Sequence, residues 1–467
     1  MKHPHTSSHQ PTFSSSPSGD RMGGTVVILG AGESGVGAAL LAMQKGYDVF
    51  VSDAGIISEK YKIELTQHNI SFEEGIHTEE KILNADEIIK SPGIPENCNI
   101  IKKIRAKNIP IISEIEFAFR HTGDSEIIAI TGSNGKTTTT ALAYHICKHA
   151  DKKCAMVGNI GNSFAKQIAL DPMPLYVVEV SSFQLDDIKN FKPHVAIITN
   201  ITEDHLDRYD YKIDNYVASK FRIIENQQQD DVFIYCLDDE TTVKNLANYS
   251  IHSKLAPITM NKSLPQGAYL ANAQLHLKWK NEEMEMNVAD FALKGKHNLY
   301  NSMAAGLSAL SIGIKKEKIR EALQTFESLE HRMEYVATIR GVEFINDSKA
   351  TNINSTWFAL ESMNKPVILI LGGIDKGNDY NLLKELVKDN VKAIVCLGTD
   401  NRKIHEAFGD IVSLMINTSN AEEAVQAAFH FADKGDVVLL SPACASFDLF
   451  KNYEDRGKQF KQAVKNL

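Results

Sequence analysis

The sequence predicts an α/β protein of three successive units, and three observations lead to this prediction. Short runs rich in β-branched residues alternate with helix-forming stretches along most of the chain. Two of these runs, near residues 26 and 127, lead into glycine-containing turns and then into helices. Polar clusters follow several other runs, which is typical of the carboxyl edge of a parallel sheet, where ligands bind.

The composition is that of an ordinary soluble globular protein. The chain has 467 residues, of which 43% are hydrophobic and 23% charged, and its formal net charge is -9. The length suggests roughly two to four domains, and the negative charge argues against nucleic acid as the main partner. No apolar run reaches about 18 residues, so no membrane insertion is expected. The six cysteines form no C-x-x-C pair and are typical of reduced thiols in a cytoplasmic protein.

Residues 1–24 are rich in serine, histidine and proline and contain no apolar segment. This composition predicts a disordered leader and argues against a secretory signal. Met22 offers an alternative start for translation.

The first unit, residues 25–113, begins with a predicted strand at residues 26–29. A G-x-G-x-x-G turn from Gly30 to Gly35 and an alanine-rich helix follow, and the next predicted strand ends on Asp53. Strand, glycine turn, helix, strand and acid in this order predict a Rossmann-like nucleotide-binding domain. NAD, another ligand or no ligand all remain open for this turn. The loop at residues 91–95 follows a further predicted strand and lies at the same sheet edge.

The central unit, residues 114–329, is organised around a phosphate-binding loop. The predicted strand 127–131 breaks into Thr-Gly-Ser-Asn-Gly-Lys-Thr-Thr at residues 131–138 and then into a helix. The glycines let backbone N–H groups converge on phosphate oxygens. Lys136 is placed to reach the outer phosphates, and the Thr137 hydroxyl is suited to ligate Mg²⁺. Ile130 stands where the strict pattern has glycine, so this is a variant form.

Two further predicted strands of the central unit end in clusters that contain Glu179 and His205. Acids and histidine at neighbouring strand ends are what a Mg²⁺–nucleotide site requires. Residues 258–291 alternate apolar and polar, which suggests antiparallel strands after a mainly parallel sheet. Asn298 and Asn301 lie on one face of the following helix, where they either cap the helix or contact a base.

The third unit, residues 330–467, repeats the strand–helix alternation and is predicted to be a second Rossmann-like domain. Its polar turns at residues 347–352, 372–377 and 441–448 all follow predicted strands. Three units, two of which flank a phosphate loop, imply a nucleotide and two further substrates. This layout favours a ligase, in which a carboxylate attacks the γ-phosphate and an amine then displaces phosphate. An NAD-dependent oxidoreductase and a nucleotide-dependent switch are the alternatives. Closure of the units about hinges near residues 113 and 329 is also expected.

Six motifs make the sequence resemble the Mur ligase family over nearly the whole chain after about Thr25; they lie at residues 131–138, 179–185, 202–209, 295–298, 346–352 and 441–448. The phosphate loop alone also fits folylpolyglutamate synthetase. The last two motifs, together with the first unit, point to the branch that adds D-glutamate. The resemblance implies ATP-dependent amide-bond formation through an acyl phosphate, in the cytoplasm, during peptidoglycan precursor synthesis. It leaves a sibling ligase with another amino acid as a further alternative.

The resemblance also implies the ligands and where they bind. The small-molecule substrates would be UDP-N-acetylmuramoyl-L-alanine, D-glutamate and ATP, with two Mg²⁺ ions, and the protein would be a monomer. The positions matching UDP-substrate contacts are Gly32, Glu33, Ser34, Asp53, Ser91, Pro92, Gly93 and Asn159. The positions matching ATP contacts are Gly132, Ser133, Asn134, Gly135, Lys136, Thr137, Thr138, Asn298, Asn301, Arg332 and Asp347.

The remaining matched positions concern D-glutamate, the metal ions and catalysis. Those for D-glutamate are Thr351, Lys376, Ser446 and Phe447. The metal positions are Thr137, Glu179, His205 and Lys220, the last as a carbamate, which turns a cation into an anionic ligand. The catalytic positions are Lys136, His205, Lys220 and Lys349.

Overall fold

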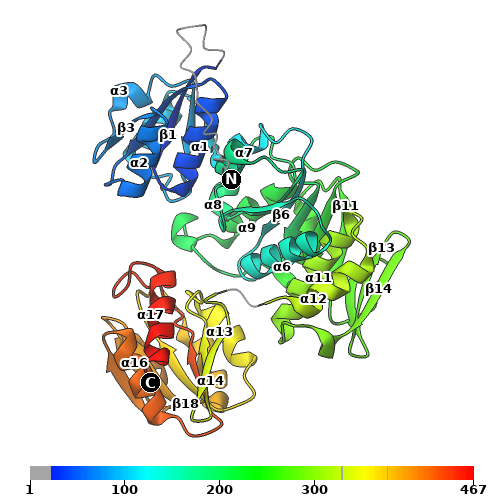
Figure 1. Ribbon diagram of the computed structural model, residues 1–467, viewed down its shortest axis with the longest axis vertical. Helices are drawn as coiled ribbons and strands as arrows, with labels where there is room; N and C mark the ends of the chain where they lie inside the picture. The colour runs from blue at the N-terminus through cyan, green and yellow to red at the C-terminus, as the bar shows by residue number, and fades with distance from the viewer. Residues whose placement is uncertain (1–22, 328–329, 376) are drawn as a thin grey trace, which may run out of the picture.

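The computed structural model describes residues 23–327, 330–375 and 377–467. Residues 1–22 of the predicted leader, Met22 included, the hinge position 329 and the glutamate position Lys376 therefore lie outside the described residues. Three sheets follow one another along the chain and are covered by helices (Figure 1). The α/β class and the three-part architecture are as predicted. Among the described helices, none combines the length and the apolar character needed to cross a membrane.

The first sheet has the strand order β3-β2-β1-β4-β5, and its strands pair in parallel. Side chains of β1 alternate between two separate cores, with Val26 and Ile28 on one face and Val27 and Leu29 on the other. Both faces are buried under helices, which is why the strand reads as a continuous apolar run. The elements are β1 (Thr25–Leu29), α1 (Glu33–Gln44), β2 (Asp48–Asp53), α2 (Glu59–Gln67), β3 (Ser71–Glu74), α3 (Glu79–Ile82), β4 (Glu87–Lys90), α4 (Asn99–Ala106) and β5 (Ile111–Ser113).

The central sheet has the order β14-β13-β12-β11-β10-β9-β6-β8-β7. The strands from β7 to β12 pair in parallel, whereas β12, β13 and β14 form an antiparallel meander, as the alternating pattern predicted. The strands are β6 (Glu126–Thr131), β7 (Ala155–Gly158), β8 (Leu175–Glu179), β9 (Val195–Ile198), β10 (Val232–Cys236), β11 (Lys254–Thr259), β12 (Gly267–Ala271), β13 (Gln274–Trp279) and β14 (Glu282–Asn287).

Helices α6 and α11 pack side by side on this sheet (Figure 1). A glycine lets α11 lie close to the sheet, because a Cβ placed on Gly306 would lie 2.8 Å from the Cδ1 atom of Leu277 in β13. The helices of the central unit are α5 (Glu114–Phe119), α6 (Lys136–His149), α7 (Phe164–Leu170), α8 (Ser182–Leu185), α9 (Ile213–Phe221), α10 (Glu240–Asn245), α11 (Lys296–Ser311) and α12 (Lys316–Thr325).

The third sheet has the order β15-β16-β20-β17-β18-β19 and is parallel apart from its edge strand β15. Helices α16 and α17 pack against each other (Figure 1). The elements are β15 (Glu334–Ile339), β16 (Val342–Asn346), α13 (Ile353–Glu361), β17 (Val367–Leu371), α14 (Lys384–Asn390), β18 (Val391–Leu397), α15 (Arg402–Phe408), β19 (Met415–Thr418), α16 (Ala421–Phe431), β20 (Val437–Leu440) and α17 (Tyr453–Lys465).

Helix packing and ion pairs join the first two units. Helix α7 packs against α1, and the Oε1 atom of Glu114 accepts hydrogen bonds of 2.6 Å from both the Ser163 hydroxyl and the Ala165 N–H at the start of α7. Burial raises the pKa of Glu114 to about 7. Nearby, Asp187 forms ion pairs of 2.9 Å with Lys90 and with Arg105. These contacts seat the first unit on the central one.

Candidate active site

The phosphate loop connects β6 to α6 and depends on its two glycines. Gly132 has φ 145° and Gly135 has φ 82°, backbone conformations that side chains disfavour. Neighbouring side chains also fill the space that a Cβ would need. A Cβ on Gly132 would lie 1.9 Å from Thr199 Oγ1, and one on Gly135 would lie 2.4 Å from Asn301 Oδ1. The loop is thus held against the end of β9 and against α11, with the α6 N-terminus directed at it.

Two lysines, the half-buried Lys136 and the buried Lys220, converge on the loop. The ammonium of Lys136 donates to the carbonyls of Gly132 at 2.7 Å and Ser133 at 2.9 Å. Lys220, of which 1% is exposed, donates to the same Gly132 oxygen at 2.7 Å and lies over the Tyr216 ring. Burial lowers the pKa of both amines, and for Lys220 the pKa falls well below its ordinary value. The Lys136 ammonium makes the loop a positive site for an anion.

A buried acid faces these cations. Glu179, at the end of β8, is 1% exposed and accepts a hydrogen bond of 2.8 Å from Asn159 Nδ2 through its Oε1 atom. Its Oε2 atom is buried without a hydrogen-bond partner among the described residues. A buried carboxylate oxygen of this kind suits a cation, and the proximity of Glu179 counters the lowering of the Lys136 pKa. The residues therefore fit a Mg²⁺ ion at this edge.

His205 lies in the turn after β9, with a left-handed φ of 54°. Its Nε2 atom is 3.7 Å from Asp204 Oδ2, and its ring packs edge-on against Phe183. Thr137, in the first turn of α6, is buried. The predicted metal positions Thr137, Glu179 and His205 thus lie at the carboxyl ends of three adjacent strands, β6, β8 and β9, with Lys220 reaching the same loop from α9.

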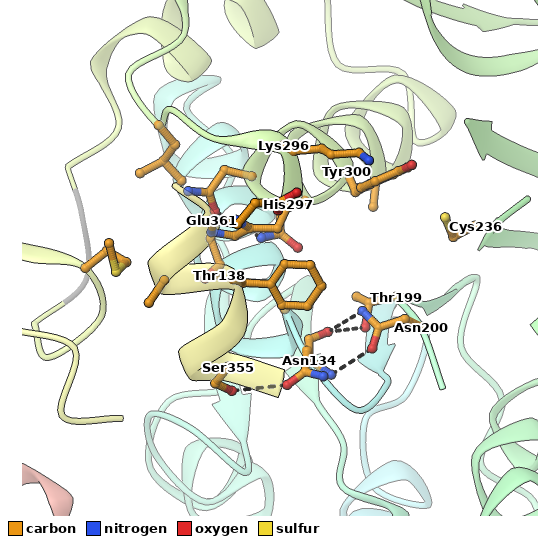
Figure 2. A pocket seen from close by; sticks show the side chains of 18 of the residues that line it. Asn134, Thr138, Thr199, Asn200, Cys236, Lys296, His297, Tyr300, Ser355 and Glu361 are labelled. Atoms are coloured by element: carbon orange, nitrogen blue, oxygen red, sulfur yellow. Dashed lines mark hydrogen bonds between the residues drawn. The ribbon is translucent and has the colours of Figure 1, made fainter. Parts of the chain in front are cut away.

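A cavity of about 380 Å³, cavity 1, opens beside the phosphate loop (Figure 2). Seven of the predicted ATP positions line it: Asn134, Gly135, Thr138, Asn298, Asn301, Arg332 and Asp347. Gly132, Ser133, Lys136 and Thr137 belong to the same loop but do not line this cavity. The sequence interpretation missed the lining residues Cys236, Asp238, Lys296, His297, Tyr300, Trp357, Phe358 and Glu361. Cys236 and Asp238 sit at the end of β10, and a polar strand end was the available signal for them.

Asn298 and Asn301 are internal to α11 and do not serve as its N-cap, which is Gly295. Asn301 Nδ2 donates to Asn298 Oδ1 at 3.2 Å, and Asn298 Nδ2 donates to the Lys294 carbonyl at 2.8 Å. Asn301 Oδ1 accepts from the Thr139 hydroxyl of α6 at 3.1 Å. The two amides therefore line cavity 1 as an oriented pair, so N-capping is ruled out as their role.

The third unit turns its sheet edge toward the loop. Asp347, after β16, accepts hydrogen bonds from Ser441 Oγ at 2.9 Å and from the Met333 N–H at 3.2 Å. Burial raises the pKa of Asp347 to about 7, although the nearby Arg332 opposes this shift. Burial, together with Arg332, lowers the pKa of Lys349 to about 8. The pKa values of Asp347 and Lys349 thus lie at about 7 and about 8, so both side chains change charge near neutral pH.

Three side chains at the start of α13 hold the third unit against the central one. Ser355 Oγ donates to Asn134 Oδ1 at 3.2 Å (Figure 2). Asn354 Nδ2 donates to Thr202 Oγ1 at 3.1 Å, and Asn352 Nδ2 donates to Asp204 Oδ2 at 3.4 Å. The phosphate loop is therefore in direct contact with the start of α13.

The predicted glutamate positions lie apart from cavity 1. Thr351 follows β16, while Ser446 and Phe447 follow β20, so all three share the carboxyl edge of the third sheet. Ser446 is buried, whereas Phe447 is 67% exposed. None of the three lines cavity 1.

A second cavity, of about 730 Å³ (cavity 2), lies at the glycine turn of the first unit. It is lined by all the predicted UDP-substrate positions of that unit: Gly32, Glu33, Ser34, Asp53, Ser91, Pro92 and Gly93. Asp53 Oδ2 accepts the Ala31 N–H at 2.7 Å, which fixes the turn. Asn159 does not line cavity 2 and is instead bonded to Glu179.

Arg208 links cavity 2 to the central unit. Its guanidinium donates to the carbonyls of Pro92 and Ile94 at 3.3 Å and of Gly93 at 3.5 Å. The same guanidinium lies over the Phe183 ring, 4.5 Å from its centroid. Phe183 also packs on His205. The loop that lines cavity 2 is therefore connected to the edge of the central sheet that carries the predicted metal positions.

Comparison with known proteins agrees with this arrangement. Residues 25–100 match the model of the MurD N-terminal domain, residues 130–309 the Mur ligase middle domain, and residues 331–444 the Mur ligase glutamate ligase domain. Solved structures share the fold: a UDP-N-acetylmuramate-alanine ligase of Thermotoga maritima aligns with a TM-score of 0.62 at 18% identity, over 95% of this chain and 99% of that one. The chain belongs to the Mur ligase family.

Curated relatives narrow the assignment within the family. A protein of Christiangramia forsetii is 52% identical over 96% of this chain and 100% of its own length, and one of Bacteroides thetaiotaomicron is 52% identical over 95% and 99%. A Chloroherpeton thalassium protein is 40% identical over 94% and 97%. All three bear the name UDP-N-acetylmuramoylalanine--D-glutamate ligase. This chain is therefore similar over its length to D-glutamate-adding Mur ligases.

Proposed function

We propose that this protein joins D-glutamate to UDP-N-acetylmuramoyl-L-alanine with conversion of ATP to ADP and phosphate, in the synthesis of peptidoglycan precursors. One observation carries the proposal: full-length relatives at 52% identity bear this activity in their name. Family membership decides against an NAD-dependent oxidoreductase and a nucleotide switch. The same relatives favour D-glutamate over the amino acids of sibling ligases and over a folylpolyglutamate synthetase-like reaction.

The reaction has two displacement steps. The carboxylate of the sugar-nucleotide substrate attacks the γ-phosphorus, the bond from that phosphorus to the β–γ bridging oxygen breaks, and ADP leaves. The D-glutamate amine then attacks the acyl carbon, phosphate leaves with the C–O electron pair, and the amine loses a proton. Negative charge develops on phosphoryl oxygens and then on the acyl oxygen. The cations at the phosphate loop are suited to stabilise both transition states.

The chain's own residues divide this work in our proposal. The N–H groups of the loop at residues 132–138 hold the phosphates, and Lys136 follows the γ-phosphoryl group as it transfers. Lys349 and His205 are the other polar side chains that lie near the acyl phosphate. Asn298, Asn301, Arg332 and Asp347 bind the adenosine and phosphate parts of ATP. Thr351, Lys376, Ser446 and Phe447 bind D-glutamate.

Enzymes of this family use ATP and Mg²⁺, and Mg²⁺ supplies charge neutralisation of the phosphates when bound. We propose two ions, held by Thr137, Glu179, His205 and Lys220, the last as a carbamate. Two observations support this assignment: the unpartnered Oε2 atom of Glu179, and a Lys220 amine whose lowered pKa favours the neutral form that reacts with CO₂. The carbamate would supply an anionic oxygen ligand.

The three units take the roles predicted for them in this proposal. Residues 25–113 bind the UDP substrate, residues 114–329 bind ATP, and residues 330–467 bring in the amino acid. Cavity 2 supports the first role, with Asn159 extending the site toward the central unit. We propose a cytoplasmic monomer whose units close about hinges near residues 113 and 329.

A coupled phosphate-release assay with a panel of amino acids tests the function. Phosphate release is expected only when UDP-N-acetylmuramoyl-L-alanine, D-glutamate, ATP and Mg²⁺ are all present. Omitting one substrate at a time is the control. ATP turnover that continues without either co-substrate, or faster product formation with L-alanine or a diamino acid than with D-glutamate, would contradict the proposal.

A further inference from the structure

Phe358 is an aromatic side chain of the third unit that faces the central one. It lies on α13, where its neighbours Ala359 and Leu360 are buried in a hydrophobic core of the third unit. Phe358 itself is half-buried and belongs to none of the hydrophobic clusters formed by the described residues. It lines cavity 1 instead, and its ring centroid is 5.6 Å from that of His297 in the central unit. Its position is therefore not explained by the packing of its own unit.

Trp357 braces the Phe358 ring. The two centroids are 5.2 Å apart with the ring planes at 90°. Trp357 packs on the core of the third unit and also lines cavity 1. An edge-to-face pair of this kind holds the Phe358 ring in a defined orientation.

The lining of cavity 1 combines two kinds of surface. Asn134, Gly135 and Thr138 bring phosphate-loop backbone and hydroxyl groups, whereas Ile258, Phe326 and Phe358 bring apolar and aromatic surface. In Figure 2, Ser355 and Glu361 of α13 lie across the cavity from Cys236, at the end of β10. A nucleotide has the same division, with a polyphosphate at one end and a flat ring at the other. Flat bases stack on aromatic side chains.

His297 adds a polar atom beside this aromatic surface. Its Nδ1 is buried and has no hydrogen-bond partner among the described residues. Burial, together with the charge of Arg332, lowers the pKa of His297 to about 4, so the imidazole is neutral at physiological pH. A neutral imidazole offers one donor and one acceptor, which suits the edge of a purine.

We propose that Phe358, braced by Trp357, forms the nucleobase-binding wall of cavity 1, so that the base of ATP bridges the central and third units. This inference rests on the proposed ATP-dependent function and assigns the base-binding element of that site. It makes Phe358 a ligand-contacting residue contributed by the unit that also brings in the amino acid. The base, as well as the phosphates, then holds α13 against the phosphate loop.

Binding of two probes to the full-length protein tests this assignment. Phe358→Ala is expected to weaken ADP binding about tenfold by calorimetry, while binding of inorganic tripolyphosphate, which has no base, stays within about twofold. Phe358→Tyr, which keeps the ring, should restore ADP binding. Lys136→Ala is the opposite control and should weaken both probes. Equal losses for ADP and tripolyphosphate in Phe358→Ala would indicate a structural role and overturn the inference.

Intrinsic fluorescence gives a second readout without truncating Phe358. The chain has two tryptophans, Trp279 and Trp357, and Trp279 is buried in β13. ADP should change the emission of the wild-type protein, tripolyphosphate should not, and Trp357→Phe should abolish the ADP response. A wild-type enzyme that forms product but whose Phe358→Ala variant binds ADP with unchanged affinity would overturn this inference alone. A wild-type protein that neither binds ADP nor forms product would overturn the proposed function as well.

Discussion

The turn after β1 and the turn after β6 follow the same backbone plan and differ in charge. Each leaves a buried parallel strand, passes through glycines and enters a helix whose N-terminus points at the ligand edge. The second turn has Lys136 and Lys220 on one carbonyl and Glu179 nearby. The described residues that line cavity 2 include Glu33, Asp53 and Glu79 but neither lysine nor arginine.

This contrast shows that the backbone conformation of a turn and its ligand preference have different origins. The glycine pattern decides where the backbone goes, whereas buried charges decide which ligand is held. Acids at the end of β2 accept hydrogen bonds from N–H or hydroxyl groups, as Asp53 does from Ala31. They suit the ribose and base of a sugar nucleotide better than a bare triphosphate. The Lys136 ammonium at the second turn suits the γ-phosphate. Four experiments test whether the two turns are as different as their charges indicate.

The largest difference is expected on removal of the loop lysine. Lys136→Ala should lower kcat about a thousandfold, because a cation that tracks the transferring phosphoryl group is lost. Affinity for the UDP substrate, measured by calorimetry, should stay within about twofold. Lys148→Ala, at the exposed end of the same helix, is the matched control and should be unchanged. A parallel loss of UDP-substrate affinity would show that the two turns do not act separately.

The second experiment concerns the negative charge proposed at Lys220. In CO₂-free buffer kcat should fall about 10- to 100-fold and return on addition of bicarbonate, because the proposed carbamate would be lost as a metal ligand. Lys220→Gln should be as slow and should not respond to bicarbonate. Lys212→Gln, at the exposed N-cap of the same helix, should behave as wild type. Activity independent of CO₂ would refute the carbamate.

At the first turn the expected effect is smaller and depends on which glycine is changed. A Cβ on Gly32 meets nothing within 4 Å, so Gly32→Ala should fold normally. Because this residue lines cavity 2, the added methyl should raise the KM for the UDP substrate about tenfold and leave the KM for ATP unchanged. Gly35→Ala is the contrast, since its Cβ would lie 1.8 Å from the Gly30 carbonyl oxygen. It should lower the melting temperature. If Gly32→Ala lowered the melting temperature and Gly35→Ala only raised the KM, the prediction would be wrong for both glycines.

The smallest effect is a pH dependence confined to ATP. The pKa of Lys349 is lowered to about 8, so its ammonium loses the proton as pH rises through that value. The kcat/KM for ATP, which reports the free enzyme, should fall about fourfold by pH 8.5 relative to pH 7. With saturating ATP, bound phosphate keeps Lys349 charged, so kcat/KM for the UDP substrate should stay level. Lys349→Arg should remove the ATP dependence. An equal fall for both substrates would argue against this residue as the cause.

Local patterns were sufficient to predict much of the fold. The runs leading into Gly30 and Gly132 predict strand, turn and helix because period and turn chemistry are encoded within about 20 residues. The alternation over residues 258–291 predicts the β12–β14 meander for the same reason. By contrast, strand order depends on contacts between distant segments, and no local pattern places β6 between β8 and β9.

The site was predictable only where it coincides with motifs. Loop residues and strand-end acids carry their own signal, whereas Phe358 looks like an ordinary helix residue in the sequence, and the motif that contains His297 does not show that the two side chains meet. They meet because two separate units pack with α13 beside α11. Similarly, the hydrogen bond from Ser355 to Asn134 spans 221 residues of chain. Such pairings follow from the packing of separate units, which cannot be predicted from a single stretch of sequence.

The hydrogen bonds of Lys136 to the carbonyls of Gly132 and Ser133 have a consequence for turnover. The Lys136 ammonium donates hydrogen bonds to two backbone carbonyls of the loop, so these carbonyls compete with a bound anion for the lysine. An incoming anion must offer more oxygen contacts than those carbonyls to draw the ammonium away. A triphosphate does so, whereas a single orthophosphate left after transfer offers fewer. We therefore expect the return of the lysine to these carbonyls to favour departure of the spent phosphate.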